Sequence, residues 1–377
     1  MEKGNDKMKE IGVVIDGVKV SAHEGMTILE AAEQSGISIP TLCHKKGLTP
    51  IGSCRVCVVE LEGSGRLVGS CHTPIEEGMV IYTRSPKVLE ARKMILELLL
   101  VSHTGSCVTD PGVAECELHQ IAAEVEAGFP RFPVRGPRFY PVEELNPYVQ
   151  RDMSKCILCY RCIRVCTEIA QENLYSMAYR GFNSKVIVDF DEHLNKEVCK
   201  DCGVCVEYCP TGALRWRGSV RKGQAREVSK HRIQKALPTE DKKREELLGM
   251  LKDVQKSIGF VSRESMVEIA QSIGLTLSEV YGVATFYSFI SVKPMGKHVI
   301  RICKSVPCYL KNAAMIIASV EEEIGIKPGE TTEDGMFSFE LTNCIGACDQ
   351  APAMLVDDEV FGNLTPESIP KILKSYH

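Results

Sequence analysis

Cysteine is the residue type in this chain best suited to chemistry, and it is concentrated in short runs. The sequence contains 18 cysteines among 377 residues, and the stretches 156–166 and 199–209 hold four each. Cysteines two or three residues apart are typical of metal sites, whereas disulfide frameworks belong mainly to short secreted chains. The sequence therefore predicts metal binding in preference to structural disulfides.

The two runs share the spacing C-x2-C-x2-C-x3-C, which returns after 43 residues. Three thiolates within seven residues can hold three corners of a [4Fe-4S] cluster, while the fourth cysteine reaches the other cluster. We therefore expect one cluster on Cys156, Cys159, Cys162 and Cys209, and a second on Cys199, Cys202, Cys205 and Cys166. Two zinc sites are the alternative, although zinc ligands usually come as pairs from two separated hooks. The doubled spacing resembles bacterial two-[4Fe-4S] ferredoxins and predicts an internal duplication with pseudo-twofold symmetry.

A third set of cysteines is spaced Cys43-x10-Cys54-x2-Cys57-x13-Cys71. A close pair with two outlying cysteines suits a [2Fe-2S] cluster, in which each iron takes two thiolates, and zinc on the same four thiolates is the alternative. This spacing resembles the amino-terminal ferredoxin domain of iron-only hydrogenases and of the large iron-sulfur subunit of NADH:quinone oxidoreductase. The resemblance implies a β-grasp ferredoxin fold.

The same resemblance implies a further cluster in the segment that follows. The family pattern His-x3-Cys-x2-Cys-x5-Cys reads here as His103, Cys107, Asp110 and Cys116, with aspartate in place of the middle cysteine. A carboxylate can replace a thiolate on iron, so that a third [4Fe-4S] cluster is retained with an altered potential. Alternatively, residues 109–112 form a simple β-turn, and the remaining Cys and His residues are ordinary buried or surface residues. The preserved spacing favours retention.

The last set of cysteines is Cys303-x4-Cys308 and Cys344-x3-Cys348. Alone, two such pairs can hold zinc. Their setting, with CKSVPCYL at a strand end and CIGACDQAP before another strand, resembles the thioredoxin-like [2Fe-2S] subunit of NADH:quinone oxidoreductase. The preceding LTLSEVYGVATFYSFI resembles the helical lead-in of that family. The resemblance covers residues 241–377 and implies a second [2Fe-2S] cluster.

The elements that must position the first cysteines are predicted by periodicity and capping patterns. Apolar residues alternate on both sides of the Asp-Gly pair at 16–17, which predicts a β-hairpin with a type I′ turn. Thr27 and Glu30 form a capping box at the start of a helix. Ser85 begins a second helix, which leads the chain to the predicted histidine of the third site.

The last part of the chain is predicted to be helical and then to alternate strands with helices. Ser265 with Glu268 and Thr276 with Glu279 are capping boxes of two short helices. The alternation that follows predicts a small α/β domain. Its predicted elements are strands at 298–303, 337–342 and 353–357, and helices at 312–324 and 366–376.

We expect an α+β multidomain protein whose domains follow the cysteine sets. Five prolines between 128 and 147 predict a connector, and eight basic residues with one acidic residue between 215 and 235 predict a solvated linker. The expected order is a [2Fe-2S] β-grasp ferredoxin domain at 9–84, a His-Cys cluster-like segment at 85–126, a proline-rich connector at 127–150, a two-[4Fe-4S] ferredoxin domain at 151–214, a basic linker at 215–240, and a helical lead-in with a thioredoxin-like [2Fe-2S] domain at 241–377.

Composition and missing motifs argue against several partners and activities. With 45 basic and 50 acidic side chains the formal net charge is −5, which gives no electrostatic reason to expect nucleic acid. The sequence has no apolar run of membrane-spanning length and no export signal, so we expect a cytoplasmic protein without a membrane span. It also lacks a dinucleotide-binding glycine motif, a P-loop and a nucleophile constellation. We therefore expect no complete active site on this chain.

The resemblances together imply an iron-sulfur electron-transfer subunit of an NAD(P)-linked oxidoreductase, as in electron-bifurcating hydrogenases, formate dehydrogenases and transhydrogenases. They imply an FMN- and NAD(P)H-binding flavoprotein as one partner. The other implied partner is ferredoxin, or a subunit that is a hydrogenase, a formate dehydrogenase or a second flavoprotein. A zinc-stabilised interaction protein and a self-sufficient NADH-dependent reductase are the alternatives.

Overall fold

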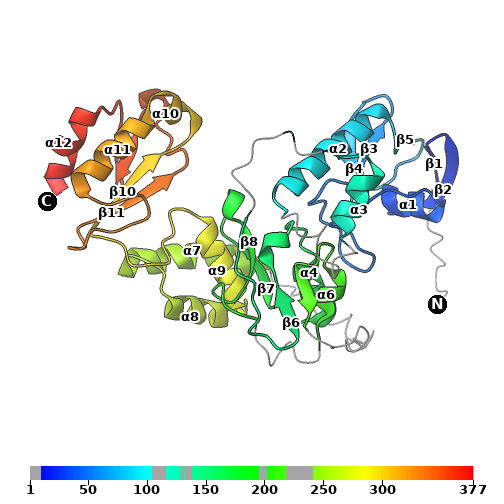
Figure 1. The fold of residues 1–377 in the computed structure, drawn as a ribbon, viewed down its shortest axis with the longest axis horizontal. Coiled ribbons are helices and arrows are strands. Elements are labelled where there is room, and N and C mark those ends of the chain that lie inside the picture. The colour runs from blue at the N-terminus through cyan, green and yellow to red at the C-terminus, as the bar shows by residue number, and fades with distance from the viewer. Residues whose placement is uncertain are drawn as a thin grey trace, which may run out of the picture. The chain divides into compact units, whose positions relative to one another are not determined.

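The computed structural model describes residues 10–103, 116–128, 131, 138–194, 202–217 and 241–376. The chain divides into two compact units, 1–239 and 240–377, and each unit contains both helices and strands (Figure 1). No helix in the described part of the chain is long and apolar enough to cross a membrane. The protein is a mixed helix-and-sheet multidomain chain.

The first unit begins with a five-stranded sheet in the order β2-β1-β5-β3-β4. The strands are β1 (Glu10–Ile15), β2 (Val18–His23), β3 (Val58–Leu61), β4 (Leu67–Gly69) and β5 (Val80–Tyr82). The predicted hairpin is confirmed, because β1 and β2 pair antiparallel and both turn residues, Asp16 and Gly17, have positive φ. Ile11, Val13 and Ile15 of β1 are buried in the core beneath this sheet.

Three helices accompany this sheet. Helix α1 (Ile28–Gln34) buries four apolar residues in the same core, and the predicted capping box of Thr27 and Glu30 is present. Helix α2 (Pro86–Val101) begins at Ser85 as predicted, where the Ser85 hydroxyl accepts a hydrogen bond from the Val88 amide. Helix α3 (Glu117–Glu124) begins directly after Cys116. Helices α2 and α3 therefore bracket the region of the third predicted site.

The cysteine-rich part of the first unit has two small antiparallel sheets and short helices. Its elements are β6 (Val149–Arg151) paired with β9 (Leu214–Trp216), β7 (Tyr175–Ala178) paired with β8 (Lys185–Val188), α4 (Arg161–Arg164), a π-helical turn (Val165–Ala170) and α6 (Val204–Tyr208). The predicted duplication is visible in the backbone. Tyr160 and Gly203, 43 residues apart, both adopt left-handed conformations at the starts of α4 and α6. Strand β9 includes the first two residues of the predicted basic linker, and 218–240 lie outside the described residues.

The second unit begins with three helices, α7 (Asp241–Ile258), α8 (Arg263–Ile273) and α9 (Leu277–Phe286). The predicted capping box of Thr276 and Glu279 is confirmed at α9. The predicted box at Ser265 is wrong, because Ser262 caps α8 and accepts a hydrogen bond from the Ser265 amide at 3.1 Å. Ser262 has the extended backbone that an N-cap requires, whereas Ser265 lies within the first turn.

A four-stranded sheet in the order β11-β10-β12-β13 completes the second unit. Its elements are β10 (His298–Cys303), α10 (Val306–Leu310), α11 (Ala313–Ile324), β11 (Phe337–Thr342), β12 (Met354–Val356), β13 (Glu359–Phe361) and α12 (Ile369–Leu373). The predicted strands and helices are confirmed here, although the last predicted helix consists of α12 flanked by 3₁₀ turns. Residues of α11 and α12 share one core with the sheet.

Candidate metal centres

The first candidate centre gathers the four cysteines of the loops around β3 and β4. The backbone amides of Cys43 and Cys54 donate hydrogen bonds to each other's sulfur, at 3.3 and 3.4 Å. Hydrogen bonds from the Cys54 and Cys71 thiols lower the pKa of Cys43 to about 2, and one from Cys71 lowers the pKa of Cys57 to about 6. The four predicted thiols therefore lie in mutual contact. This donor set fits a [2Fe-2S] cluster, which needs four thiolates in one place.

A buried arginine supports the loop that carries Cys57. The Arg92 guanidinium, from α2, donates hydrogen bonds to the carbonyl oxygens of Val56 at 3.0 Å and Val58 at 2.8 Å, on both sides of Cys57. Burial lowers the pKa of Arg92, and the neighbouring Cys57 acts in the opposite direction. The result is a cationic side chain fixed beside the first centre.

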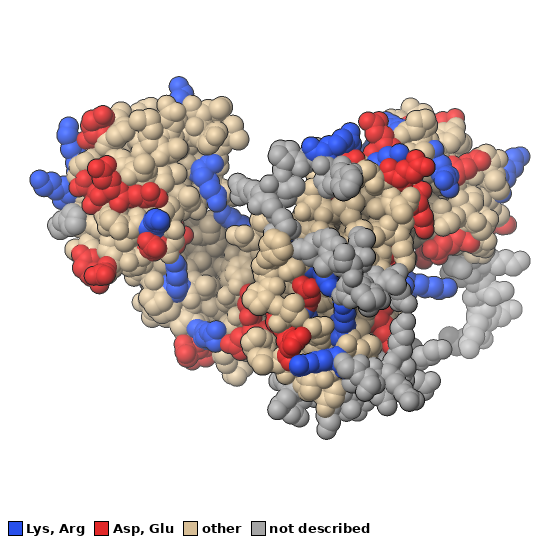
Figure 2. Space-filling model, in the orientation of Figure 1, with Lys and Arg blue, Asp and Glu red and all other residues tan. Residues whose placement is uncertain are grey.

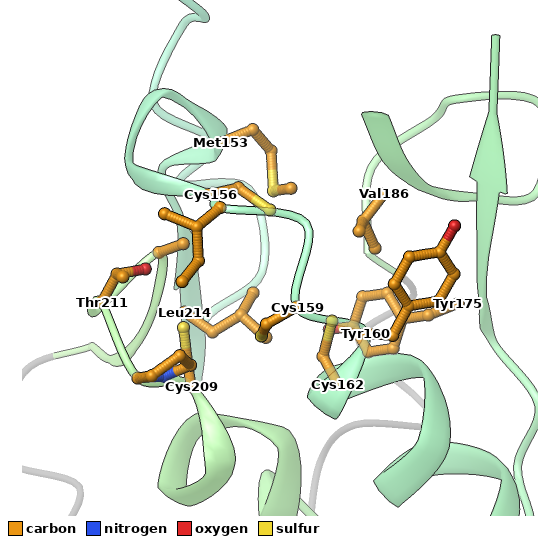
Figure 3. A pocket seen from close by; sticks show the side chains of 13 residues that line it. Met153, Cys156, Cys159, Tyr160, Cys162, Tyr175, Val186, Cys209, Thr211 and Leu214 are labelled. Atoms are coloured by element: carbon orange, nitrogen blue, oxygen red, sulfur yellow. The ribbon is translucent and has the colours of Figure 1, made fainter. Parts of the chain in front are cut away.

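The second candidate centre is a cavity lined by Cys156, Cys159, Cys162 and Cys209. Figure 3 shows the four side chains around it, with Cys209 facing the cavity from the opposite side to Cys162. Burial raises the pKa of the Cys156 thiol to about 11 and that of Cys159 to about 12. Such buried thiols become thiolates most readily when a cation binds them. The four sulfurs surround a space, as ligands of a cubane must.

The third candidate centre is a cavity lined by Cys166, Cys202 and Cys205, whereas Cys199 lies outside the described residues. Burial raises the pKa of Cys166 to about 11. Tyr175 lines both this cavity and the preceding one, and its hydroxyl lies 3.5 Å from Cys205 Sγ. Tyr175 therefore borders both cavities.

Sequence reasoning did not identify Trp216 as part of this centre. A Cβ added to Gly203, between Cys202 and Cys205, would lie only 1.8 Å from the Trp216 ring. The indole therefore packs directly against the cysteine loop. The only sequence signal is that this is the sole tryptophan of the chain.

Helix α4 connects the first and second candidate centres. Its two arginines are buried, and Arg161 donates a hydrogen bond to the His44 carbonyl at 3.0 Å while Arg164 donates to the Cys43 carbonyl. Cys43 and Cys159 also belong to one buried core, which includes Cys116. The two centres are thus neighbours within the first unit.

The predicted third cluster site is described only in part, because Cys107 and Asp110 lie outside the described residues. His103 and Cys116 do lie together, with His103 Nε2 3.7 Å from Cys116 Sγ. The structure adds His119, whose Nδ1 lies 3.2 Å from the same sulfur. The sequence signal that could have identified His119 is its position three residues after Cys116, within one helical turn.

The last candidate centre lies in the second unit. Cys303 ends β10 and Cys308 lies in α10, and both are buried, whereas Cys344 and Cys348 are exposed. Cys344 Sγ lies 3.2 Å from Cys348 Sγ, and the Gly346 amide donates a hydrogen bond to Cys344 Sγ at 3.4 Å. Burial and a hydrogen bond with Cys303 raise the pKa of Cys308. This arrangement of two close pairs fits a [2Fe-2S] cluster near the surface.

Three segments of the chain match families of iron-sulfur domains. Residues 8–86 match the family of 2Fe-2S iron-sulfur cluster binding domains, 146–215 match the ferredoxin-like domain of NADH-quinone oxidoreductase subunit 3, and 232–377 match the thioredoxin-like [2Fe-2S] ferredoxins. The chain contains iron-sulfur cluster binding domains. Its three matched ranges contain the sixteen cysteines of the four predicted clusters, and Cys107 and Cys116 fall outside them.

Several proteins similar to this chain are subunits of oxidoreductases. The NADP-reducing hydrogenase subunit HndD of Solidesulfovibrio fructosivorans is 40% identical over 218 residues, which are 55% of this chain and 36% of that protein. The mitochondrial NADH-ubiquinone oxidoreductase 78 kDa subunit of Candida albicans is 34% identical over 210 residues, 55% of this chain and 29% of that protein. The NAD⁺-reducing [NiFe]-hydrogenase in its H₂-reduced state shares 26% identity at a TM-score of 0.48, over 55% of this chain and 88% of that one. The chain thus spans about a third of the length of these two curated relatives.

Proposed function

We propose that this chain is an electron-transfer subunit of a cytoplasmic, NAD(P)-linked oxidoreductase complex. It would relay electrons between an FMN flavoprotein that oxidises NAD(P)H and ferredoxin or another redox subunit, as part of a flavin-based electron-bifurcating hydrogenase, formate dehydrogenase or transhydrogenase. When bound, the clusters would supply one-electron transfer. The observation that carries the proposal is the presence of thiol-lined centres in all three segments that match iron-sulfur domains.

The proposed ligands are the sixteen cysteines of four clusters. The [2Fe-2S] clusters would be held by Cys43, Cys54, Cys57 and Cys71 in a β-grasp domain at 9–84, and by Cys303, Cys308, Cys344 and Cys348 in the domain at 241–377. The [4Fe-4S] clusters would be held in the duplicated domain at 151–214, by Cys156, Cys159, Cys162 and Cys209, and by Cys199, Cys202, Cys205 and Cys166. Hydrogen bonds from backbone amides to Cys156 Sγ and Cys166 Sγ, both at 3.4 Å, support thiolate ligands there.

The surface beside the last centre supports a protein partner. Three apolar side chains of α10 are strongly exposed, at 68% for Val306, 69% for Tyr309 and 72% for Leu310. They flank Cys308, and Cys344 and Cys348 of the same centre are exposed too. Exposed aromatic and aliphatic side chains around a redox centre suit docking of another redox protein. We assign this surface to the flavoprotein.

The experiment that tests this function is anaerobic purification of the tagged chain, alone and with the flavoprotein that co-purifies with it. NAD(P)H is added to both, and the visible absorption of the clusters is recorded. We expect bleaching by dithionite in both samples and bleaching by NAD(P)H only when the flavoprotein is present, because no complete active site is proposed on this chain. Reduction of the isolated chain by NAD(P)H would overturn the proposal in favour of a self-sufficient reductase.

A further inference from the structure

The ends of α2 and α3 bring a histidine, a cysteine and a second histidine together, whereas Cys107 and Asp110 of the family pattern lie outside the described residues. Among the described residues, the groups that converge here are His103, Cys116 and His119, and their ligand atoms all lie within 4.8 Å of one another. Only His103 and Cys116 belong to the expected set. Two imidazoles with one thiolate form a nitrogen-rich donor set, whereas a [4Fe-4S] cluster is normally held by thiolates. Histidine and cysteine are both ordinary zinc ligands, so the donors described here suit a zinc ion.

The distances in this group are those of a single tetrahedral ion. Zinc binds sulfur at about 2.3 Å and nitrogen at about 2.0–2.1 Å, so that tetrahedral angles place the two ligand atoms about 3.5 Å apart. Cys116 Sγ lies 3.7 Å from His103 Nε2 and 3.2 Å from His119 Nδ1. The four ligands of a cubane bind different irons, so they surround a larger space than the ligands of a single ion. The four cysteines of the second centre line a cavity of this kind (Figure 3).

The hydrogen bonding of His103 prepares one nitrogen for a metal. His103 Nδ1 lies 2.9 Å from the carbonyl oxygen of Lys155, which can only accept, so Nδ1 carries the proton. In the neutral imidazole the other nitrogen, Nε2, is then the one with the acceptor lone pair, and Nε2 lies 3.7 Å from Cys116 Sγ. In metal-binding histidines, the ring nitrogen that does not bind the metal usually donates a hydrogen bond, often to a backbone carbonyl. His103 Nδ1 is in this position.

We propose that His103, Cys116 and His119 bind one zinc-type divalent ion. Both His103 and Cys116 are buried, which suits a structural ion with limited water access. Zinc does not change its oxidation state, so this site would carry no electrons. The proposal concerns a site outside the four proposed clusters, and it stands or falls separately from them.

A structural ion here would fix the start of α3 against the cysteine-rich part. The Glu117 amide donates a hydrogen bond to the Pro210 carbonyl at 2.8 Å, directly beside Cys209 of the second centre. Cys116 shares a buried core with Cys43 and Cys159. The ion would therefore tie together the protein surroundings of two proposed clusters.

The test is metal analysis of the full chain, purified anaerobically from zinc-supplemented medium, with His119→Ala as the variant and His23→Ala as the control. His23 is an exposed histidine on β2. We expect about one zinc per chain in the wild type and in His23→Ala, and loss of that zinc in His119→Ala. The iron content per chain should be the same in all three proteins. An unchanged iron content also shows that the His119→Ala variant is folded. Zinc-edge X-ray absorption should show one sulfur at about 2.3 Å and nitrogens at about 2.0–2.1 Å.

Cys116→Ser provides a second variant, in which the sulfur contribution to the zinc absorption spectrum should disappear. Several results would overturn the proposal. They are zinc that persists in His119→Ala, a zinc spectrum with sulfur ligands only, or a wild-type chain without zinc. An iron content about four atoms higher than the four clusters require, with loss of that excess in His119→Ala, would show a third [4Fe-4S] cluster instead.

Discussion

Tyr175 lines both cysteine-lined cavities of the first unit. Its hydroxyl lies 3.5 Å from Cys205 Sγ. A hydrogen bond to a cluster sulfur stabilises added negative charge and raises the reduction potential. Where the Tyr175 hydroxyl is the donor, it would raise the potential of the proposed cluster that includes Cys205.

Replacing Tyr175 by phenylalanine should lower the potential of one of the two [4Fe-4S] clusters by a few tens of millivolts, because one weak hydrogen bond to sulfur is lost. An EPR-monitored redox titration measures this. Tyr179→Phe is the matched control, since its hydroxyl bonds to Asp191 instead. Equal potentials in wild type and Tyr175→Phe would contradict the assigned hydrogen bond.

Gly203 is required because another side chain packs directly against its Cα. Its φ of 63° is matched by Tyr160, a non-glycine residue at the equivalent place of the repeat, so the backbone conformation alone does not require glycine. The Trp216 ring does, because it occupies the position of a Cβ. We expect Gly203→Ala to displace the loop and to lose about four irons per chain.

Iron analysis checks the Gly203 prediction, and Gly181→Ala is its control. Gly181 also has positive φ, at 58°, but no atom of the described residues beyond its chain neighbours lies within 4 Å of an added Cβ. The control should keep its iron. If both variants lost iron alike, backbone strain and not the indole would be responsible. Restoration of iron by a smaller residue at Trp216 in the Gly203→Ala background would confirm the steric cause.

At this scale the sequence predicts cluster ligands better than it predicts their surroundings. The spacing of cysteines such as Cys156 and Cys159 is local, so it can be read directly from the chain. Arg92 reaches the Cys57 loop across more than thirty residues, and Tyr175 faces Cys205 across thirty. No local pattern encodes such contacts, because the fold alone brings these residues together.

At the scale of elements, α4 holds the first and second centres together through Arg161. This side chain is 1% exposed and forms two hydrogen bonds with the Glu117 carboxylate, at 2.8 and 2.9 Å, besides the bond to the His44 carbonyl. Lys45 contacts the same carboxylate from the exposed side, at 3.8 Å. The Glu117 carboxylate therefore contacts two cationic side chains, of which Arg161 is buried and Lys45 is exposed.

Arg161→Met should weaken the contact between α3, α4 and the Cys43 loop by about 2 kcal/mol, because charge-assisted hydrogen bonds in a buried site are lost. Hydrogen–deuterium exchange of α3 amides should then become about 30-fold faster where local opening governs exchange. Lys45→Met is the control and should cost under about 0.5 kcal/mol, as exposed pairs do. Similar exchange in both variants would contradict a special role for Arg161.

The elements were predictable where a pattern extends over a full turn or strand. The hairpin of β1 and β2, the capping box of α1 and the strand β10 all follow from local periodicity. Strands of three residues, such as β6 and β9, are too short to show a period and become strands only by pairing with each other. At α8, two serines three residues apart competed for the cap, and Ser262 is the one with extended backbone.

At the scale of the whole molecule, charge is spread without a dominant sign. Figure 2 shows Lys and Arg side chains interspersed with Asp and Glu over the visible face of the described residues. Protein partners would therefore be selected by apolar contacts more than by long-range attraction. The exposed apolar side chains of α10 are the clearest such surface.

Leu310→Glu should weaken binding of the proposed flavoprotein by about tenfold or more, because a charge replaces an apolar side chain at the docking surface. Biolayer interferometry with the immobilised complex partner measures the change. Val18→Glu, at another exposed apolar position in the first unit, should leave the affinity unchanged. Equal affinities for wild type and Leu310→Glu would exclude α10 from the interface.

The central claim is that sixteen cysteines of this chain hold two [2Fe-2S] and two [4Fe-4S] clusters. Iron and acid-labile sulfide analysis of the anaerobically purified full chain tests it most directly. The predicted result is a brown protein with about twelve iron atoms and about twelve sulfides per chain. A colourless protein that carries zinc on these cysteines, without sulfide, would contradict it and would indicate a zinc-stabilised interaction protein instead.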